Sequence, residues 1–214
     1  MNYGLYQSAG GVLATMHRYE VLSNNLANVE TTAFKADLAV SMERLPARIE
    51  QGAPIDPNLL LERLGGGQLS TPTAIAFTQG GLVETGSEHD LALDGDAFFV
   101  VGPERARGEQ DLSLTRDGRF TVNADGQLVM ATTGFNVLDD RNRPITLEPG
   151  AFAVDENGVV RQNEREVAQL ALRRVEHPDR LTKSGDGLLL TSPTSGAGSQ
   201  AVDTRVIQGA LEES

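Results

Sequence analysis

Histidine, serine and aspartate side chains that could take part in catalysis are few in this sequence and unsuitably spaced. The three histidines, His17, His89 and His177, are far apart, and none stands in a metal-ligand spacing such as H-E-x-x-H. Ser87, His89 and Asp90 have the residue types of a catalytic triad. Three residues so close in sequence do not readily converge in that geometry, and no nucleophile elbow is present. The sequence therefore predicts no catalytic residues.

Glycine-rich and acidic stretches suggest two further kinds of site, and neither fits its motif. The glycine run at 65–67 lacks the Lys-Ser/Thr pair that completes a phosphate-binding loop. A calcium loop of the EF-hand type needs Gly at its sixth position, and aligning Gly126 or Gly158 there puts Thr121 or Ala153 at the first position. Turn formation explains these Asp-Gly and Asn-Gly pairs. The sequence predicts no metal site and no cofactor.

Composition limits the classes of partner. The chain has 214 residues and a formal net charge of −12, which argues against nucleic acid and anionic membrane surfaces. It has no cysteine, so it has no disulfide framework and no thiolate metal site. No apolar stretch approaches the roughly 18 residues of a membrane span, and no basic region followed by an apolar run indicates a cleaved signal. We expect no membrane insertion.

The element that would position functional residues is an N-terminal helix with an apolar stripe. Leu5, Val12, Tyr19 and Leu26 recur every seven residues, and Met16 falls between them. We call these five residues the seam. Ala9 and Leu22 lie on or beside the same stripe. A stripe of this period packs on other helices.

Polar residues crowd the end of this helix. Asn24, Asn25 and Asn28 stand within five residues, although Asn is a mediocre helix former. A buried amide between helices can fix the register of the partners. The β-branched pair at 31–32 then favours extended chain and ends the helix. The alternative interpretation of the whole segment is an ordinary capped surface helix.

The rest of the chain indicates a mainly β fold. We expect an N-terminal helical segment over 1–36, a connector over 37–78, an antiparallel β meander or barrel-like domain over 79–205, and a closing segment over 206–214. Period-two apolar runs alternate with turn residues after residue 79. The predicted core includes Phe98, Val100, Phe120, Leu128 and Val137.

Two Asp-Gly pairs are expected to define the turns of this domain. Asp117-Gly118 and Asp125-Gly126 each separate short apolar runs. Asp-Gly between alternating strands is a strong hairpin signal, because both central residues of a type I′ turn need φ > 0. We therefore predict positive φ at Gly118 and Gly126.

Four stretches of the sequence resemble the flagellar rod and hook family, the axial proteins of the bacterial flagellum. The N-terminal stretch S-N-N-L-A-N-V-E-T-T-A-F-K, residues 23–35, is similar to the family's S-N-N-L-A-N-x-x-T-T-G-F-K. The central L-T-R-D-G-R-F-T-V-N-A-D-G-Q-L-V resembles Y-T-R-D-G-x-F-x-x-x-x-x-G-x-L-V, with Leu114 where Tyr is common. The terminal Q-G-A-L-E-E-S resembles Q-G-x-L-E-x-S-N. The stretch L-x-L-x-G-D-A-F-F-V-V, residues 91–101, resembles I-x-G-x-G-F-F-x-V. Ala33 and Ala97 stand where the family usually has Gly.

The resemblance implies a structural subunit of the basal-body rod that is not an enzyme. It implies assembly with other copies, with other rod proteins, and with the hook and the surrounding ring proteins. Localisation to the periplasmic part of the rod and export by the flagellar type III apparatus are also implied. The implied assembly interface comprises Leu5, Val12, Met16, Tyr19, Ser23, Asn24, Asn25, Leu26, Asn28, Thr31, Thr32, Phe34 and Lys35.

Some alternatives stay open. The family continues past the terminal motif into a helix that pairs with the N-terminal one, so residues 206–214 are expected to lead into such a helix, which this chain lacks. The short length argues against the hook subunit, whereas the proximal and the distal rod both remain possible. An acidic β-rich module that binds a small ligand or a carbohydrate is the alternative from another functional class.

Overall fold

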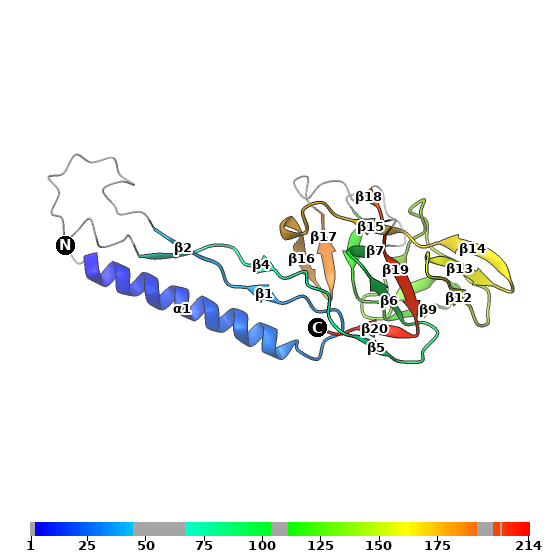
Figure 1. Ribbon diagram of the computed structural model, residues 1–214, viewed down its shortest axis with the longest axis horizontal. Coiled ribbons are helices and arrows are strands. Elements are labelled where there is room, and N and C mark those ends of the chain that lie inside the picture. Colours follow the sequence, from blue (N-terminus) through cyan, green and yellow to red (C-terminus); the bar gives the residue numbers. More distant parts are fainter. Residues whose placement is uncertain (1–2, 45–66, 104–110, 192–198, 202) are drawn as a thin grey trace. The chain divides into compact units, whose positions relative to one another are not determined.

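The computed structural model describes residues 3–44, 67–103, 111–191, 199–201 and 203–214 (Figure 1). The protein is mainly β, with antiparallel sheets, and its described part has one α-helix, at the N-terminal end. The chain forms two compact units. Unit 1 comprises residues 1–28 and 36–76, and unit 2 comprises residues 29–35 and 77–214.

Unit 1 is a helix beside a two-stranded ribbon (Figure 1). The helix is α1 (Tyr3–Ala27), and the strands are β1 (Asp37–Leu38), β2 (Ser41–Glu43), β3 (Gln68–Ser70) and β4 (Ala74–Ile75). Strand β1 pairs with β4 and β2 pairs with β3, both antiparallel. The ribbon lies within the stretch predicted as a connector, so the described part of that stretch contains ordered pairing.

Small and amide side chains let α1 approach the ribbon. Ala14 is buried, and Gly10 and Asn25 on the same face are half-buried. A Cβ at Gly10 would lie 3.3 Å from the backbone oxygen of Gln68, so the ribbon comes close to the helix backbone there. The helix ends at Ala27, where the side-chain amide of Asn28 donates to the Asn24 carbonyl at 2.9 Å. This bond satisfies a carbonyl of the last turn.

Unit 2 is built on a nine-stranded antiparallel sheet. Its main path has the order β16-β17-β8-β7-β11-β10-β9, and β15 pairs with both β7 and β18. The strands are β7 (Ala97–Gly102), β8 (Ser113–Thr115), β9 (Phe120–Val122), β10 (Leu128–Met130), β11 (Asn136–Val137), β15 (Leu172–Arg174), β16 (Thr182–Gly185), β17 (Leu188–Leu190) and β18 (Ser199–Gln200).

Smaller sheets complete unit 2. Strands β12, β13 and β14 form one sheet, β6 pairs with β19, and β5 pairs with β20. These elements are β5 (Leu82–Glu84), β6 (Leu91–Asp94), β12 (Ala153–Val154), β13 (Val159–Gln162), β14 (Arg165–Gln169), β19 (Arg205–Gln208) and β20 (Ala210–Glu212), with a 3-10 turn η2 (Pro178–Arg180). The closing segment predicted over 206–214 therefore pairs with strands from the start of the domain.

The core of unit 2 contains the residues that the sequence predicted. The side chains of Phe98, Val100, Phe120, Leu128 and Val137 are all at most 4% exposed. Strand β7 departs from the expected alternation because all six of its residues are buried. It is the central strand, with β8 on one side and β11 and β15 on the other, and packing covers both of its faces.

The two Asp-Gly pairs have different roles. Gly126 has φ of 77° in the turn that joins β9 to β10, as the hairpin pattern predicts. The hairpin prediction for Asp117-Gly118 is wrong: β8 pairs with β7 and β17, β9 pairs with β10, and Gly118 has no positive φ. A Cβ at Gly118 would lie 1.5 Å from the backbone oxygen of Leu91. Close approach of two backbones, and not a left-handed turn, explains this glycine.

Candidate assembly surface and its anchor

The seam predicted on α1 is exposed along its length. The side chains of Leu5, Val12, Met16, Tyr19 and Leu26 are between 54% and 71% exposed. Leu13 and Leu22 are exposed to a similar degree and widen the apolar surface on either side. The sequence pattern does not include Leu13, because it does not stand at a seven-residue spacing from the seam.

The seam faces away from the ribbon. Successive residues of an α-helix are rotated by about 100°, so residues on one face recur every three or four positions. Gly10, Ala14 and Asn25 lie on the ribbon side by this rule. Val12 and Tyr19 then lie roughly half a turn round the helix from them. Unit 1 therefore leaves the apolar side of its helix open.

The predicted asparagines lie in different environments. Asn24 and Ser23 are exposed, whereas Asn25 is half-buried. The Asn25 side-chain amide donates to the Asp37 carbonyl at 2.8 Å, and the Asp37 backbone N–H donates to Asn25 Oδ1 at 2.9 Å. Asn25 thus makes the two hydrogen bonds that a neighbouring strand would make. It joins the helix to β1 within one unit.

Residues 31–35 of the N-terminal motif belong to unit 2. Thr31 is exposed, Thr32 and Phe34 are half-buried, and Ala33 and Lys35 are buried. Ala33 has φ of 55°, and its backbone N–H donates to the Glu212 carbonyl at 2.8 Å. A left-handed conformation costs an L-residue with a Cβ roughly 1–2 kcal/mol, which explains why glycine suits this position.

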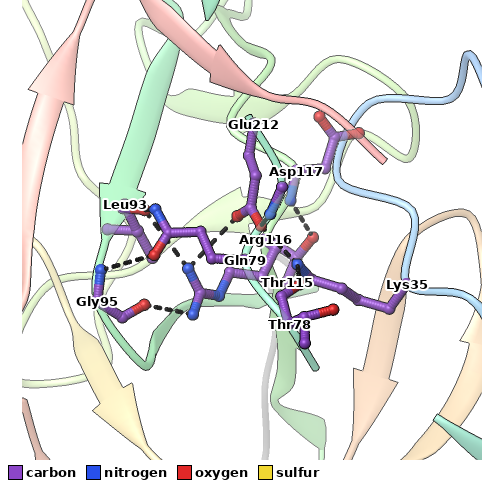
Figure 2. A network of polar contacts seen from close by, with 10 residues as sticks. Lys35, Thr78, Gln79, Leu93, Gly95, Thr115, Arg116, Asp117 and Glu212 are labelled. Atoms are coloured by element: carbon purple, nitrogen blue, oxygen red, sulfur yellow. Dashed lines mark hydrogen bonds and ion pairs between the residues drawn. The ribbon is translucent and has the colours of Figure 1, made fainter. Parts of the chain in front are cut away.

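Lys35 and Glu212 form a buried ion pair, shown in Figure 2. Lys35 Nζ lies 2.5 Å from Glu212 Oε1, and it also donates to the Thr78 carbonyl at 2.9 Å. The Gly80 backbone N–H donates to the same carboxylate oxygen at 3.0 Å. Arg116 Nη1 approaches the other oxygen of Glu212 at 3.4 Å. One carboxylate thus holds two cations.

Arg116 extends this network into the sheet. Its Nη2 donates to the Gly95 carbonyl at 2.5 Å, and the guanidinium lies 5.2 Å from the centre of the Phe98 ring. Burial lowers the pKa of Arg116 below its ordinary value, and the attraction of Glu212 and Asp96 opposes that shift. Lys35, Arg116 and Glu212 are each at most 6% exposed. Removing one member would leave a buried charge without its partner.

Lys183 provides a second hold on the same segment. Its Nζ donates to the Lys35 carbonyl at 2.5 Å and lies 4.4 Å from the centre of the Phe34 ring. Together with the Ala33 hydrogen bond, these contacts fix the backbone of residues 33–35. The motif residues Ala33, Phe34 and Lys35 therefore form an anchor inside unit 2.

The central motif T-R-D-G-R contributes Arg116 to the charge network around the anchor and braces that network. Thr115 Oγ1 donates to the Gly187 carbonyl at 2.9 Å and accepts from the Asp117 backbone N–H at 3.0 Å. Asp117 holds the Arg119 side chain through two hydrogen bonds, at 3.0 and 2.7 Å. Sequence reasoning matched Arg116 and Glu212 to motifs but gave them no role. Charged residues inside short motifs of a β domain were the available signal.

No arrangement for catalysis or metal binding emerges from the described part of the chain. Its acidic and histidine side chains form no group of three or more that could hold a metal ion. An open cavity of about 590 Å³ beside Phe98 and Arg116 brings Arg174 together with Asp96 and Glu176 at its lining. The described residues contain no helix long and apolar enough to cross a membrane.

Comparisons with known proteins agree with the resemblance seen in the motifs. The sequence profile described as "Flagellar hook protein FlgE/F/G D1 domain" matches residues 92–162. The flagellar basal-body rod protein FlgF of Caulobacter vibrioides is 34% identical over the whole chain, which spans 82% of that relative. FlgF of Rhizobium meliloti is 32% identical with the same coverage. FlgG of Agrobacterium fabrum is 31% identical over 89% of this chain and 74% of its own length.

The relatives thus include rod proteins of two kinds, and the matched profile also covers the hook protein. All three of these relatives exceed 30% identity, and the chain spans 74% to 82% of their length. The chain belongs to the family of flagellar basal-body rod and hook proteins, structural components of the flagellum.

Proposed function

We propose that this rod subunit assembles through the exposed seam of α1. We further propose that the anchor fixes the chain after the helix to unit 2. The exposure of the seam is the observation that carries the proposal. Five large apolar side chains lie open on one helix face. Burying each would contribute roughly 1.5–3 kcal/mol. A contact between copies that uses different surfaces on each partner extends into a helical filament when its rotation does not close.

The role of the subunit is mechanical and not enzymatic. A rod that transmits torque between motor and hook needs a stiff assembly, so its free energy resides in repeated interfaces. The partners are other copies of this chain and other rod proteins, with the hook and the surrounding ring proteins as neighbours. The subunit acts in the periplasmic part of the rod after export by the flagellar type III apparatus, and it needs no nucleic acid.

Among rod proteins, we infer a subunit of the FlgF kind. Support comes from three FlgF relatives that match the whole chain at 28–34% identity. Expression of the gene in one strain that lacks FlgF and in another that lacks FlgG tests this inference. Swimming restored in the first strain alone is the expected result, and restoration in the second alone would reverse the assignment. No observation favours the alternative of a ligand-binding β module.

Leu26→Asp tests the role of the seam. A charge on this exposed position should abolish incorporation into the rod and leave unit 2 folded. Val167→Asp is the matched control, because Val167 is an exposed apolar residue of β14 away from the seam. Rod fractions from cells and thermal melting of the purified chains give the readouts. Normal rods and normal swimming with Leu26→Asp would exclude the seam as an interface.

A further inference from the structure

The ribbon of unit 1 has its own apolar surface. Leu38, Val40 and Met42 are exposed and alternate with Ala39 and Ser41, which are half-buried. Leu69 is exposed on the neighbouring strand and is paired directly with Met42. We call Leu38, Val40, Met42 and Leu69 the outer strip.

The outer strip faces away from α1. Arg18 Nη2 of the helix donates to Ser41 Oγ at 3.3 Å, so Ser41 is turned towards the helix. Side chains of a strand alternate between its two faces, which turns Val40 and Met42 to the opposite side. All the exposed large apolar side chains in the described part of unit 1 lie either on α1 or on the outer strip. Unit 1 therefore exposes apolar surface on two opposite sides.

The ribbon needs cover on this second side. A two-stranded antiparallel ribbon is at best marginally stable by itself in water. Helix α1 covers one of its faces through contacts with β1 and β3. The outer strip leaves the other face apolar and open.

We propose that the outer strip of one copy packs on the seam of α1 in the next copy. This inference rests on the proposed function, because it names the surface that meets the seam. The arc from Leu22 to Leu13 carries the seam and spans roughly half of the helix circumference, whereas one packing partner needs a stripe of about 100°. The exposed polar residues Thr15, Ser23 and Glu20 lie within the same arc. The helix therefore has room for the ribbon of a neighbour beside another helix.

The low charge of both surfaces fits a second copy of this chain as the occupant. The chain has a net charge of −12, so copies repel one another unless their contact surfaces carry little charge. Residues 38–42 and 67–76 contain no charged side chain, and Arg18 and Glu20 are the only Lys, Arg, Asp or Glu residues of α1. Two different surfaces on opposite sides of one unit give a head-to-tail contact, which extends into a helical filament when its rotation does not close a ring.

Disulfide cross-linking in rods tests the contact, because the chain contains no cysteine of its own. Two cysteines cross-link only when their Cβ atoms come within about 4 Å. The full-length gene carries Met16→Cys together with Met42→Cys, and rods are isolated and oxidised. We expect a ladder of cross-linked subunits. Met16→Cys with Thr73→Cys is the control, because Thr73 is an exposed ribbon residue outside the outer strip.

A second pair, Met16→Cys with Leu69→Cys, tests the same contact between seam and outer strip from the neighbouring strand β3. Absence of a ladder from both pairs in intact rods would overturn the proposal. Leu69→Asp should lower incorporation into rods at least tenfold relative to Thr73→Asp. If Leu26→Asp abolishes incorporation while Leu69→Asp does not lower it, the outer strip is excluded and the seam stands. If neither variant lowers incorporation, the proposed function itself is wrong.

Discussion

Lys35 and Glu212 form a buried ion pair between residues 177 positions apart in the sequence. Lys35 ends the N-terminal motif, and Glu212 lies in the terminal motif. Neither motif explains its charged residue alone, since a buried charge needs a partner. The pair, with Arg116 from the central motif, brings the end of the N-terminal motif together with the central and terminal motifs inside unit 2.

Loss of the shared carboxylate should destabilise unit 2. Glu212→Gln keeps the shape of the side chain but leaves Lys35 and Arg116 as buried cations, and we expect a loss of about 3 kcal/mol or more in the free energy of unfolding. Glu213→Gln is the matched control, because Glu213 is exposed. Urea denaturation of the full chain measures both. A change below about 0.5 kcal/mol for Glu212→Gln would show that the pair is not a stabilising element.

Replacing Ala33 and Ala97 with glycine should change the free energy of unfolding in opposite directions. Ala33 has φ of 55°, so Ala33→Gly relieves a strained backbone and should raise the free energy of unfolding by about 0.5–1 kcal/mol. Ala97 is fully buried in β7 without positive φ, so Ala97→Gly should lower it by roughly 1 kcal/mol. Thermal melting of the two single variants compares them. Equal signs would contradict the assigned backbone conformations.

Gly118 should tolerate a methyl group far less well than Gly134. A Cβ at Gly118 would lie 1.5 Å from the Leu91 oxygen, whereas one at Gly134 meets nothing within 4 Å. Gly134 has φ of 72°, so Gly134→Ala should cost roughly 1 kcal/mol. Gly118→Ala must move a backbone and should cost about 3 kcal/mol or more. Equal denaturation midpoints for the two variants would refute the close approach.

Asn25 should stabilise unit 1 from within. Asn25→Ala removes two hydrogen bonds to Asp37 and should cost about 1–2 kcal/mol locally, seen as faster amide exchange over residues 37–43. Asn24→Ala is the control, because the Asn24 side chain is exposed and its backbone carbonyl is kept. Unchanged exchange in Asn25→Ala would mean that the amide serves a partner and not β1.

Asp139 should contribute to the loss of stability in acid. Burial raises the pKa of Asp139, but hydrogen bonds from Arg143 and from the backbone of Arg141 and Arg143 outweigh it and hold the pKa below its ordinary 3.8. Its contribution to stability is thus complete above pH 3.8 and is lost as the pH falls through the lower pKa of the folded state. Asp139→Asn should show a smaller drop in melting temperature than the unmodified chain between pH 6 and pH 2. An identical drop in melting temperature for both chains would contradict the lowered pKa of Asp139.

The sequence determined the elements that depend on local patterns. The heptad of Leu5, Val12, Tyr19 and Leu26 identified the helix and its apolar face, because helical periodicity is set by nearest neighbours along the chain. The alternation of apolar and polar residues, together with the Asp125-Gly126 pair, predicted the hairpin of β9 and β10, because a tight turn is also set by neighbouring residues. The family followed from motifs that are themselves contiguous.

The tertiary structure decided what depends on residues far apart in sequence. Asp117-Gly118 has the same local pattern as Asp125-Gly126, yet it forms no hairpin. Its glycine instead allows the backbone of Leu91 to approach closely. Likewise, the partners of Lys35 and Asn25 lie in segments that no local pattern connects to them. A sequence shows which groups must be satisfied when buried, but only the folded chain brings the satisfying group within hydrogen-bonding distance.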